Sequence, residues 1–158
     1  MLVTMILVAS CQMKTKTVPY DPIAAKAEVS KAMDSINMAA KARDNKTFLS
    51  FFTEDGLFCG TDPKELWTKE DYAKLVEKML ADTTMHFDMK VDKKEIRVEK
   101  DGNSAITLEQ FITRWSKPIT LRSTMHFVKV DNKWMVDFSN IAFIPDNKDI
   151  PKITAAMK

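Results

Sequence analysis

Residues 119–144, ITLRSTMHFVKVDNKWMVDFSNIAFI, contain two alternating stretches separated by Asp131-Asn132. Apolar side chains take the odd positions before this pair and the even positions after it. A period of two predicts β-strands, and a two-residue turn between them predicts an antiparallel hairpin. If Val130 pairs with Lys133, both apolar sets lie on one face of the sheet. The stretch therefore predicts a hairpin with one buried face.

Two polar residues interrupt that buried face, Ser123 and Asn140, and this register places them opposite each other. The preceding strand, expected at Ser104–Trp115, carries Gln110 among its apolar even positions, and a two-residue turn after it places Gln110 beside Ser123. Polar groups on an apolar face need a partner, a water or a ligand. We expect these three side chains either to form the polar part of a ligand site or to satisfy one another in a core.

The opposite face of the predicted hairpin pairs His126 with Asp137. A carboxylate that orients an imidazole is the arrangement of a catalytic base. An exposed cross-strand pair is also a common structural feature, which contributes only about 0.2–1 kcal/mol. This is the more polar face, with Thr120, Arg122, Thr124 and Ser139 near the pair, but it also carries four large apolar side chains: Val128, Met135, Ile141 and Phe143. These four side chains make the face too apolar to be fully exposed, so it is a candidate homodimer interface.

Helical patterns precede the strands. From Ile23 to Asp44 an apolar stripe follows spacings of four, three and four, and Thr68 with Asp71 forms a capping box before a second amphipathic helix. A short apolar helix or turn is expected at residues 48–52. Alternation begins after Asp82, with a change of parity that predicts a bulge near Lys93-Lys94. Helices followed by antiparallel hairpins predict an α+β fold with helices packed on one face of a sheet.

The N-terminal segment has the pattern of an export signal. Residues 1–10, MLVTMILVAS, are apolar and uncharged, and the run Leu7–Cys11 resembles the cleavage box of bacterial lipoproteins. This resemblance implies acylation of Cys11, a polar tether over residues 11–22, and a cell-envelope protein held at the outer membrane, on its periplasmic or surface side. The alternative is a buried N-terminal strand.

Composition excludes several classes of function. Lys+Arg 24 against Asp+Glu 22 gives a net charge of +2 with no basic block, so nucleic acid is not an expected partner. Three glycines are too few and too scattered for a phosphate-binding or dinucleotide-binding loop. With two histidines and two cysteines, no metal site is expected, nor any cofactor. Cys59 is expected to be a small buried side chain, with a reactive thiol as the alternative.

Residues 57–67, LFCGTDPKELW, resemble the SnoaL-like branch of the nuclear-transport-factor-2-like superfamily. The segments KPITLRST at 117–124 and KWMV at 133–136 agree with this resemblance. It implies a cone, in which helices close over a strongly bent antiparallel sheet around an internal pocket, and dimerisation through the sheet in many members. The cone domain is expected at residues 23–145, followed by a tail at 146–158.

The resemblance also suggests site residues. Asp62, in the G-T-D-P match, is the candidate for a carboxylate in the pocket. The alternative is a turn, because Asp before Pro is a common turn former. Trp67 is expected as a pocket wall or a packing residue, and Phe138 and Asn140 stand where relatives often carry histidines. The predicted ligand-binding set is Asp62, Trp67, Gln110, Ser123, Phe138 and Asn140. No catalytic residue is assigned.

Three functions remain open from the sequence. The first is binding of a small, mostly apolar ligand without catalysis, and the second is a dimeric protein-interaction module. The third is an isomerase, cyclase or dehydratase, for which Asp62, Glu109 and His126 are the candidate bases.

Overall fold

The computed structural model describes residues 21–87, 89–114 and 118–157. The predicted signal peptide, Cys11 and nearly all of the predicted tether lie outside these residues. In order, the chain forms α1 (Pro22–Lys41), α2 (Asn45–Leu49), β1 (Phe52–Cys59), β2 (Leu66–Trp67), α3 (Lys69–Ala81), β3 (Lys90–Val98), β4 (Ser104–Arg114), β5 (Pro118–Val130), β6 (Lys133–Phe143), the 3₁₀ turn η1 (Asn147–Asp149) and α4 (Ile150–Ala156).

Helix α1 starts where its sequence supplies a cap. The Asp21 side chain accepts hydrogen bonds from the backbone N–H groups of Ile23 and Ala24, and Pro22 occupies the first turn. The predicted apolar stripe is confirmed, because all four of its members are buried: Val29, Met33, Ile36 and Ala40. The Thr68 cap of α3 is confirmed as well, since its hydroxyl accepts from the Asp71 N–H.

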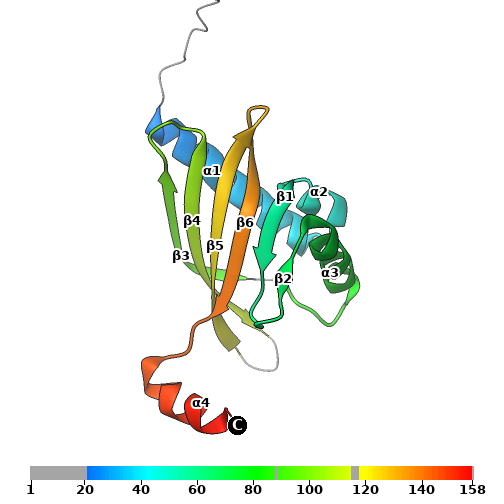
Figure 1. The fold of residues 1–158 in the computed structure, drawn as a ribbon, viewed down its shortest axis with the longest axis vertical. Helices are drawn as coiled ribbons and strands as arrows, with labels where there is room; N and C mark the ends of the chain where they lie inside the picture. The colour runs from blue at the N-terminus through cyan, green and yellow to red at the C-terminus, as the bar shows by residue number, and fades with distance from the viewer. Residues whose placement is uncertain (1–20, 88, 115–117, 158) are drawn as a thin grey trace, which may run out of the picture.

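One mixed sheet of six strands lies under α1, in the order β2-β1-β6-β5-β4-β3. Figure 1 shows α1 crossing one face of the sheet, α2 and α3 beside β1 and β2, and α4 apart from the sheet at the C-terminal end. The predicted α+β class is confirmed. The prediction of a purely antiparallel sheet is wrong at one place, because β1 pairs with β6 in parallel. Because β1 and β6 are far apart in the sequence, no local pattern of residues predicts that they pair.

The predicted strand register is wrong by one residue in two places. Phe127 pairs with Val136 as expected, but a bulge at Asp137 then pairs His126 with Phe138 and Ser123 with Ile141. Between β4 and β5, Ser123 pairs with Glu109 and not with Gln110. Since side chains alternate, a slip of one residue exchanges the two faces of a strand.

The face that the slip turns inward is the odd face of β4. Its five residues are 0–6% exposed: Ala105, Thr107, Glu109, Phe111 and Thr113. The slip also turns Ile141 and Phe143 toward the inner side, because they pair with Ser123 and Leu121. They are therefore not part of the outer face on which the sequence predicted them.

Strand β3 contains the predicted bulge, close to its expected place. The register shifts between Val91 and Lys93, after which Lys94 pairs with Glu109 and Ile96 with Thr107. The bulge turns Lys94 toward α1 and so places a cation on the inner face.

An aromatic cluster joins β1 to α3 and anchors the other end of the sheet. The Tyr72 ring stacks on Phe58 with 4.7 Å between ring centroids, and Phe48, Phe52 and Trp67 surround it. Burial raises the pKa of the Tyr72 hydroxyl well above its ordinary value. Aromatic rings therefore fill this part of the interior.

Candidate functional site

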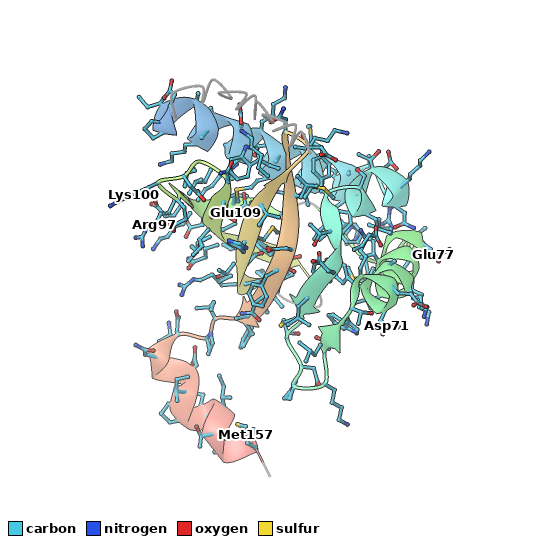
Figure 2. The ribbon with its side chains drawn as sticks, turned by 45° about the horizontal axis from the view of Figure 1, so that its top comes forward. Asp71, Glu77, Arg97, Lys100, Glu109 and Met157 are labelled. Carbon is cyan, nitrogen blue, oxygen red and sulfur yellow. The ribbon has the colours of Figure 1, made fainter. Side chains whose placement is uncertain are left out.

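A polar row crosses the inner face of the sheet under α1. Lys94 of β3 pairs with Glu109 of β4, and Glu109 pairs with Ser123 of β5. Glu109 is 4% exposed and Ser123 is 3% exposed. Figure 2 shows Glu109 near the middle of the molecule, whereas Asp71, Glu77 and Lys100 lie at its periphery. A carboxylate so deeply buried requires partners.

Helix α1 supplies the partners of this row. The Asn37 side-chain amide donates to Glu109 Oε2 at 3.2 Å. Lys94 Nζ donates to Asp34 Oδ1 at 2.7 Å and to the Ser30 carbonyl at 3.4 Å, and it lies 3.8 Å from Glu109 Oε1. We refer to Asn37, Lys94, Glu109 and Ser123 together as the polar centre.

The polar centre has unused hydrogen-bonding capacity. The Ser123 hydroxyl is buried and has no hydrogen-bond partner among the residues that the structure describes. Glu109 Oε1 forms an ion pair with Lys94 at 3.8 Å, a separation too long for a hydrogen bond. Leaving buried polar atoms unpaired costs about 1–3 kcal/mol each. A water or a ligand group that forms a hydrogen bond with the Ser123 hydroxyl would remove this cost.

Two hollows open along the groove between α1 and β3, one on each side of the polar centre. The first has a volume of about 360 Å³ and is lined by Asn37, with Met38, Phe87, Met89 and Val91 as apolar walls. The second has a volume of about 590 Å³ and is lined by Lys94 and Ser30, with apolar walls that include Ile23 and Ile96. Both volumes fall in the range of small-molecule sites. The same two side chains, Asn37 and Lys94, contact Glu109.

The sequence model of the SnoaL-like domain matches residues 29–138. The chain belongs to the SnoaL-like family. The match runs from α1 to β6 and contains all four residues of the polar centre. No functionally curated protein matches the sequence significantly.

Solved structures share this architecture. An NTF2-like protein of unknown function from Pseudomonas putida aligns with a TM-score of 0.70 at 14% identity, over 80% of this chain and 91% of its own. A ketosteroid isomerase-like protein from Erwinia carotovora atroseptica gives 0.59 at 17%, over 77% and 97%. A Nostoc punctiforme protein of unknown function with a cystatin-like fold gives 0.60 at 18%, over 77% and 92%. At such identities the likeness establishes the fold alone, which confirms the expected cone.

Of the polar row predicted from the sequence, only Ser123 lies on the inner face of this SnoaL-like domain. Gln110 is on the outer face, where it donates to Asp92 Oδ2 at 3.0 Å and accepts from Arg122 at 2.8 Å. Asn140 pairs with Thr124, also on the outer face. Phe138 pairs with His126 on that face. The predicted row is therefore not formed, because the register differs by one residue.

Asp62 and Trp67 lie away from the polar centre. Asp62 is exposed and its carboxylate accepts from the Lys64 N–H at 2.9 Å, while Glu65 Oε2 accepts from the N–H groups of Thr61 and Asp62. This is the geometry of a turn former. The Trp67 ring packs on Tyr72 with 6.1 Å between centroids. Among the predicted alternatives, these contacts favour the turn for Asp62 and packing for Trp67.

His126 and Asp137 are in contact although their register differs from the expected one. His126 Nδ1 lies 2.6 Å from Asp137 Oδ1, because the bulge leaves both Asp137 and Phe138 beside His126. Both side chains are about one-third exposed on the outer face, and neither lines one of the two hollows. Of the three candidate bases, only Glu109 faces the interior.

Within the described ranges no group of three or more His, Cys, Asp or Glu side chains is arranged to hold a metal ion. No helix among the described residues is both long enough and apolar enough to cross a membrane. Cys59 is half-buried and its thiol is free.

Asn37 and Lys94 are the site residues that the sequence did not predict. On α1, Ser30, Asp34 and Asn37 follow a spacing of four and three, so they form a polar stripe beside the apolar one. That spacing is a signal that could have indicated a polar site under the helix. Lys94 became recognisable only once the position of the β3 bulge was known.

Proposed function

We propose that this chain is a lipid-anchored protein of the bacterial cell envelope whose SnoaL-like domain binds a small, mostly apolar molecule without catalysis. The supporting observation is a hollow of about 360 Å³ with mostly apolar walls, lined by Asn37, whose side-chain amide donates to the buried Glu109 carboxylate. Apolar walls with a few polar anchors are typical of small-molecule sites.

Binding is tested with Nile red, an uncharged dye that fluoresces in apolar surroundings. The full chain carrying Cys11→Ser, which cannot be acylated, is titrated with the dye. Val91→Trp fills the first hollow and should abolish the fluorescence increase. Lys93→Trp is the control, since Lys93 is on the same strand and lines neither hollow. No increase with the unfilled protein, or equal increases with both variants, would contradict the proposed binding.

The lipid anchor is supported by the Leu7–Cys11 run alone. Each acyl CH₂ inserted in a bilayer contributes about 0.8 kcal/mol, so several chains on Cys11 would hold the protein firmly. Bacteria expressing the chain are fed an alkyne fatty acid, and the protein is examined for label. Label should be lost in Cys11→Ser and kept in Cys59→Ser, and it should follow the outer-membrane fraction. Equal labelling of the two variants would exclude Cys11 as the site.

A second candidate function is a homodimeric interaction module, favoured by the outer face of the sheet. The large apolar side chains that this face exposes include Leu57, Ile106, Ile112 and Phe138. Ile106→Lys should convert a dimer into a monomer in light scattering, because an interface core excludes a buried unpaired charge. Ala81→Lys adds the same charge at an exposed position on α3 and should leave the dimer intact. A monomeric parent protein at high concentration would argue against this function.

A further inference from the structure

The first hollow is lined by two cations and, within the described ranges, by no carboxylate. Lys41 belongs to α1 and Lys90 to β3, so the two ammonium groups come from the two elements that form the sides of the hollow. Both lysines are exposed. A lysine in this position packs its hydrocarbon stem along the apolar surface and keeps its charge at the water. The hollow therefore has a positively charged rim.

Below this rim the walls of the hollow are apolar. Four large side chains line it, from α1, from the segment before β3 and from β3 itself: Met38, Phe87, Met89 and Val91. Methionine side chains are flexible and polarizable, so they adapt to hydrocarbon of varied shape. The volume of about 360 Å³ is sufficient for an alkyl chain of moderate length.

Arg43 fixes the wall that Phe87 supplies. Its guanidinium donates to the backbone carbonyls of Leu80, Asp82 and Met85 at 2.7, 2.8 and 2.7 Å. The same group lies 5.4 Å from the centre of the Phe87 ring. The segment that joins α3 to β3 forms neither helix nor strand among its described residues, so these contacts hold its shape. Arg43 thus stabilises this side of the hollow and adds a positive charge behind the ring.

Glu109 is the buried carboxylate beside this hollow, but it does not line it. Asn37 lies between them, since it lines the hollow and donates to Glu109 Oε2 at 3.2 Å. Lys94 Nζ is 3.8 Å from Glu109 Oε1 and supplies a counter-charge. A ligand in the hollow would therefore contact the lysines of the rim directly, and Glu109 only through an uncharged amide.

The second hollow is less suited to an anion. Lys26 and Lys94 line it, but Lys94 donates to Asp34 Oδ1 at 2.7 Å, so a carboxylate of the protein already partly neutralises this charge. The first hollow is accordingly the better candidate for a negatively charged ligand.

We propose that the first hollow binds an amphipathic carboxylate of the fatty-acid class, with Lys41 and Lys90 donating to the carboxylate and the apolar walls holding the alkyl chain. A carboxylate only accepts hydrogen bonds and an ammonium group only donates them, so the two are complementary. This inference rests on the proposed binding function and adds the chemical class of the ligand.

The test compares octanoate, octanol and octylamine, which share one alkyl chain and differ in charge. Each is titrated into the full chain carrying Cys11→Ser, and binding is followed by calorimetry and by displacement of Nile red. Two exposed ion pairs should make octanoate bind about tenfold more tightly than octanol. Octylamine should bind most weakly. Added salt should reduce the preference for octanoate, because it screens exposed charges.

Lys41→Met/Lys90→Met keeps the unbranched stems and removes both charges, so it should make the affinities for octanoate and octanol equal. Lys31→Met/Lys93→Met is the matched control. It removes two charges from exposed positions on the same two elements, and neither residue lines a hollow. The control should preserve the tenfold preference. If the first double variant does not fold, Lys90→Met alone should leave a preference of about threefold, and Lys90→Arg should restore it.

The position of the ligand is tested separately. Octanoate should cause its largest ¹H–¹⁵N NMR shifts at Lys41, Phe87 and Val91, and Val91→Trp should abolish its binding while Lys93→Trp does not. Binding that survives Val91→Trp, with shifts at Ile23 and Ile96 of the second hollow, would overturn the inference.

Octanoate that binds no more tightly than octanol, or not at all, overturns the inference, as does a preference that survives Lys41→Met/Lys90→Met. Tightest binding of octylamine also overturns it, because a carboxylate of the protein would then set the preference. In these cases Nile red binding would still stand. Absence of Nile red binding together with absence of binding by all three compounds would instead refute the proposed function itself.

Discussion

On β4 the buried face is the more polar one, and the exposed face is the more apolar one. The inner face has three polar side chains among its five residues, Thr107, Glu109 and Thr113, and all are buried. The outer face has the apolar Ile106, Leu108 and Ile112, and two of these are more than one-third exposed. A buried polar face beside an exposed apolar one is the expected arrangement when a site lies inside the sheet and a partner surface lies outside it.

The largest difference between the two faces should appear on truncating an aromatic ring. Phe127 on the inner side is fully buried, whereas Phe138 on the outer face is 36% exposed. Phe127→Ala should lower the free energy of unfolding by about 3–5 kcal/mol, and Phe138→Ala by about 1 kcal/mol. Urea denaturation of both variants gives the two values. Equal losses would mean that the outer face is covered in solution, as in a dimer.

A smaller effect should come from the charges of the inner face. Lys94→Met should cost about 2 kcal/mol, because it leaves the Glu109 carboxylate buried without a cation. Adding Glu109→Gln should recover part of this loss, since the uncompensated charge is then gone. The four free energies form a double-mutant cycle. Lys93→Met, whose parent residue is exposed on the same strand, should change stability by less than about 0.5 kcal/mol. Strictly additive losses would show that Lys94 and Glu109 do not interact.

The smallest effect concerns the rim of the inner face, where Glu28 of α1 meets the β5–β6 hairpin. Glu28 Oε2 accepts from Trp134 Nε1 at 2.9 Å and from Lys129 Nζ at 3.0 Å, and these hydrogen bonds hold the pKa of its carboxyl below the ordinary value. A lowered folded-state pKa contributes stability at neutral pH that is lost as the pH falls through it. Glu28→Gln should therefore cost about 0.5–1 kcal/mol at pH 7.

This cost should begin to shrink as the pH falls through about 4.5, the ordinary pKa of the carboxyl, and should disappear once the pH lies below the lowered pKa of the folded state. Denaturation of the parent and of Glu28→Gln at several pH values measures the difference. Glu77→Gln, at an exposed position on α3, is the control and should show no such pH dependence. A cost that persists at low pH would indicate that the carboxylate charge is not what stabilises this contact.

The parts of the fold that depend on local patterns were predictable. The stripe of α1, the Thr68 cap and the Asp131-Asn132 turn each follow from residues within one or two turns of chain, and the structure contains all of them. Positive φ at both Asp131 and Asn132 is the conformation that a two-residue hairpin turn requires.

The inner site was not predictable in the same way. Which face of β4 is buried depends on its register with β5, and three residues separate the Arg114 and Pro118 partners where two were expected. Hydropathy favoured the even face because Ile106, Leu108 and Ile112 are apolar. Glu109 was considered only as a possible base, since nothing local shows that it shares a face with Ser123.

The bulge at Asp137 has a consequence for how this sheet tolerates changes in length. Asp137 has no partner on β5, so the residues on either side of it keep their own partners whether or not it is there. Its deletion should leave Ser139 and Ile141 facing inward and remove only the carboxylate beside His126. A deletion elsewhere within β6 would instead turn the rest of the strand over. A deletion at this one point would thus keep the pairing of β6 with β5 and the inward side chains in place, inside a strand where a gap is normally the most damaging mutation.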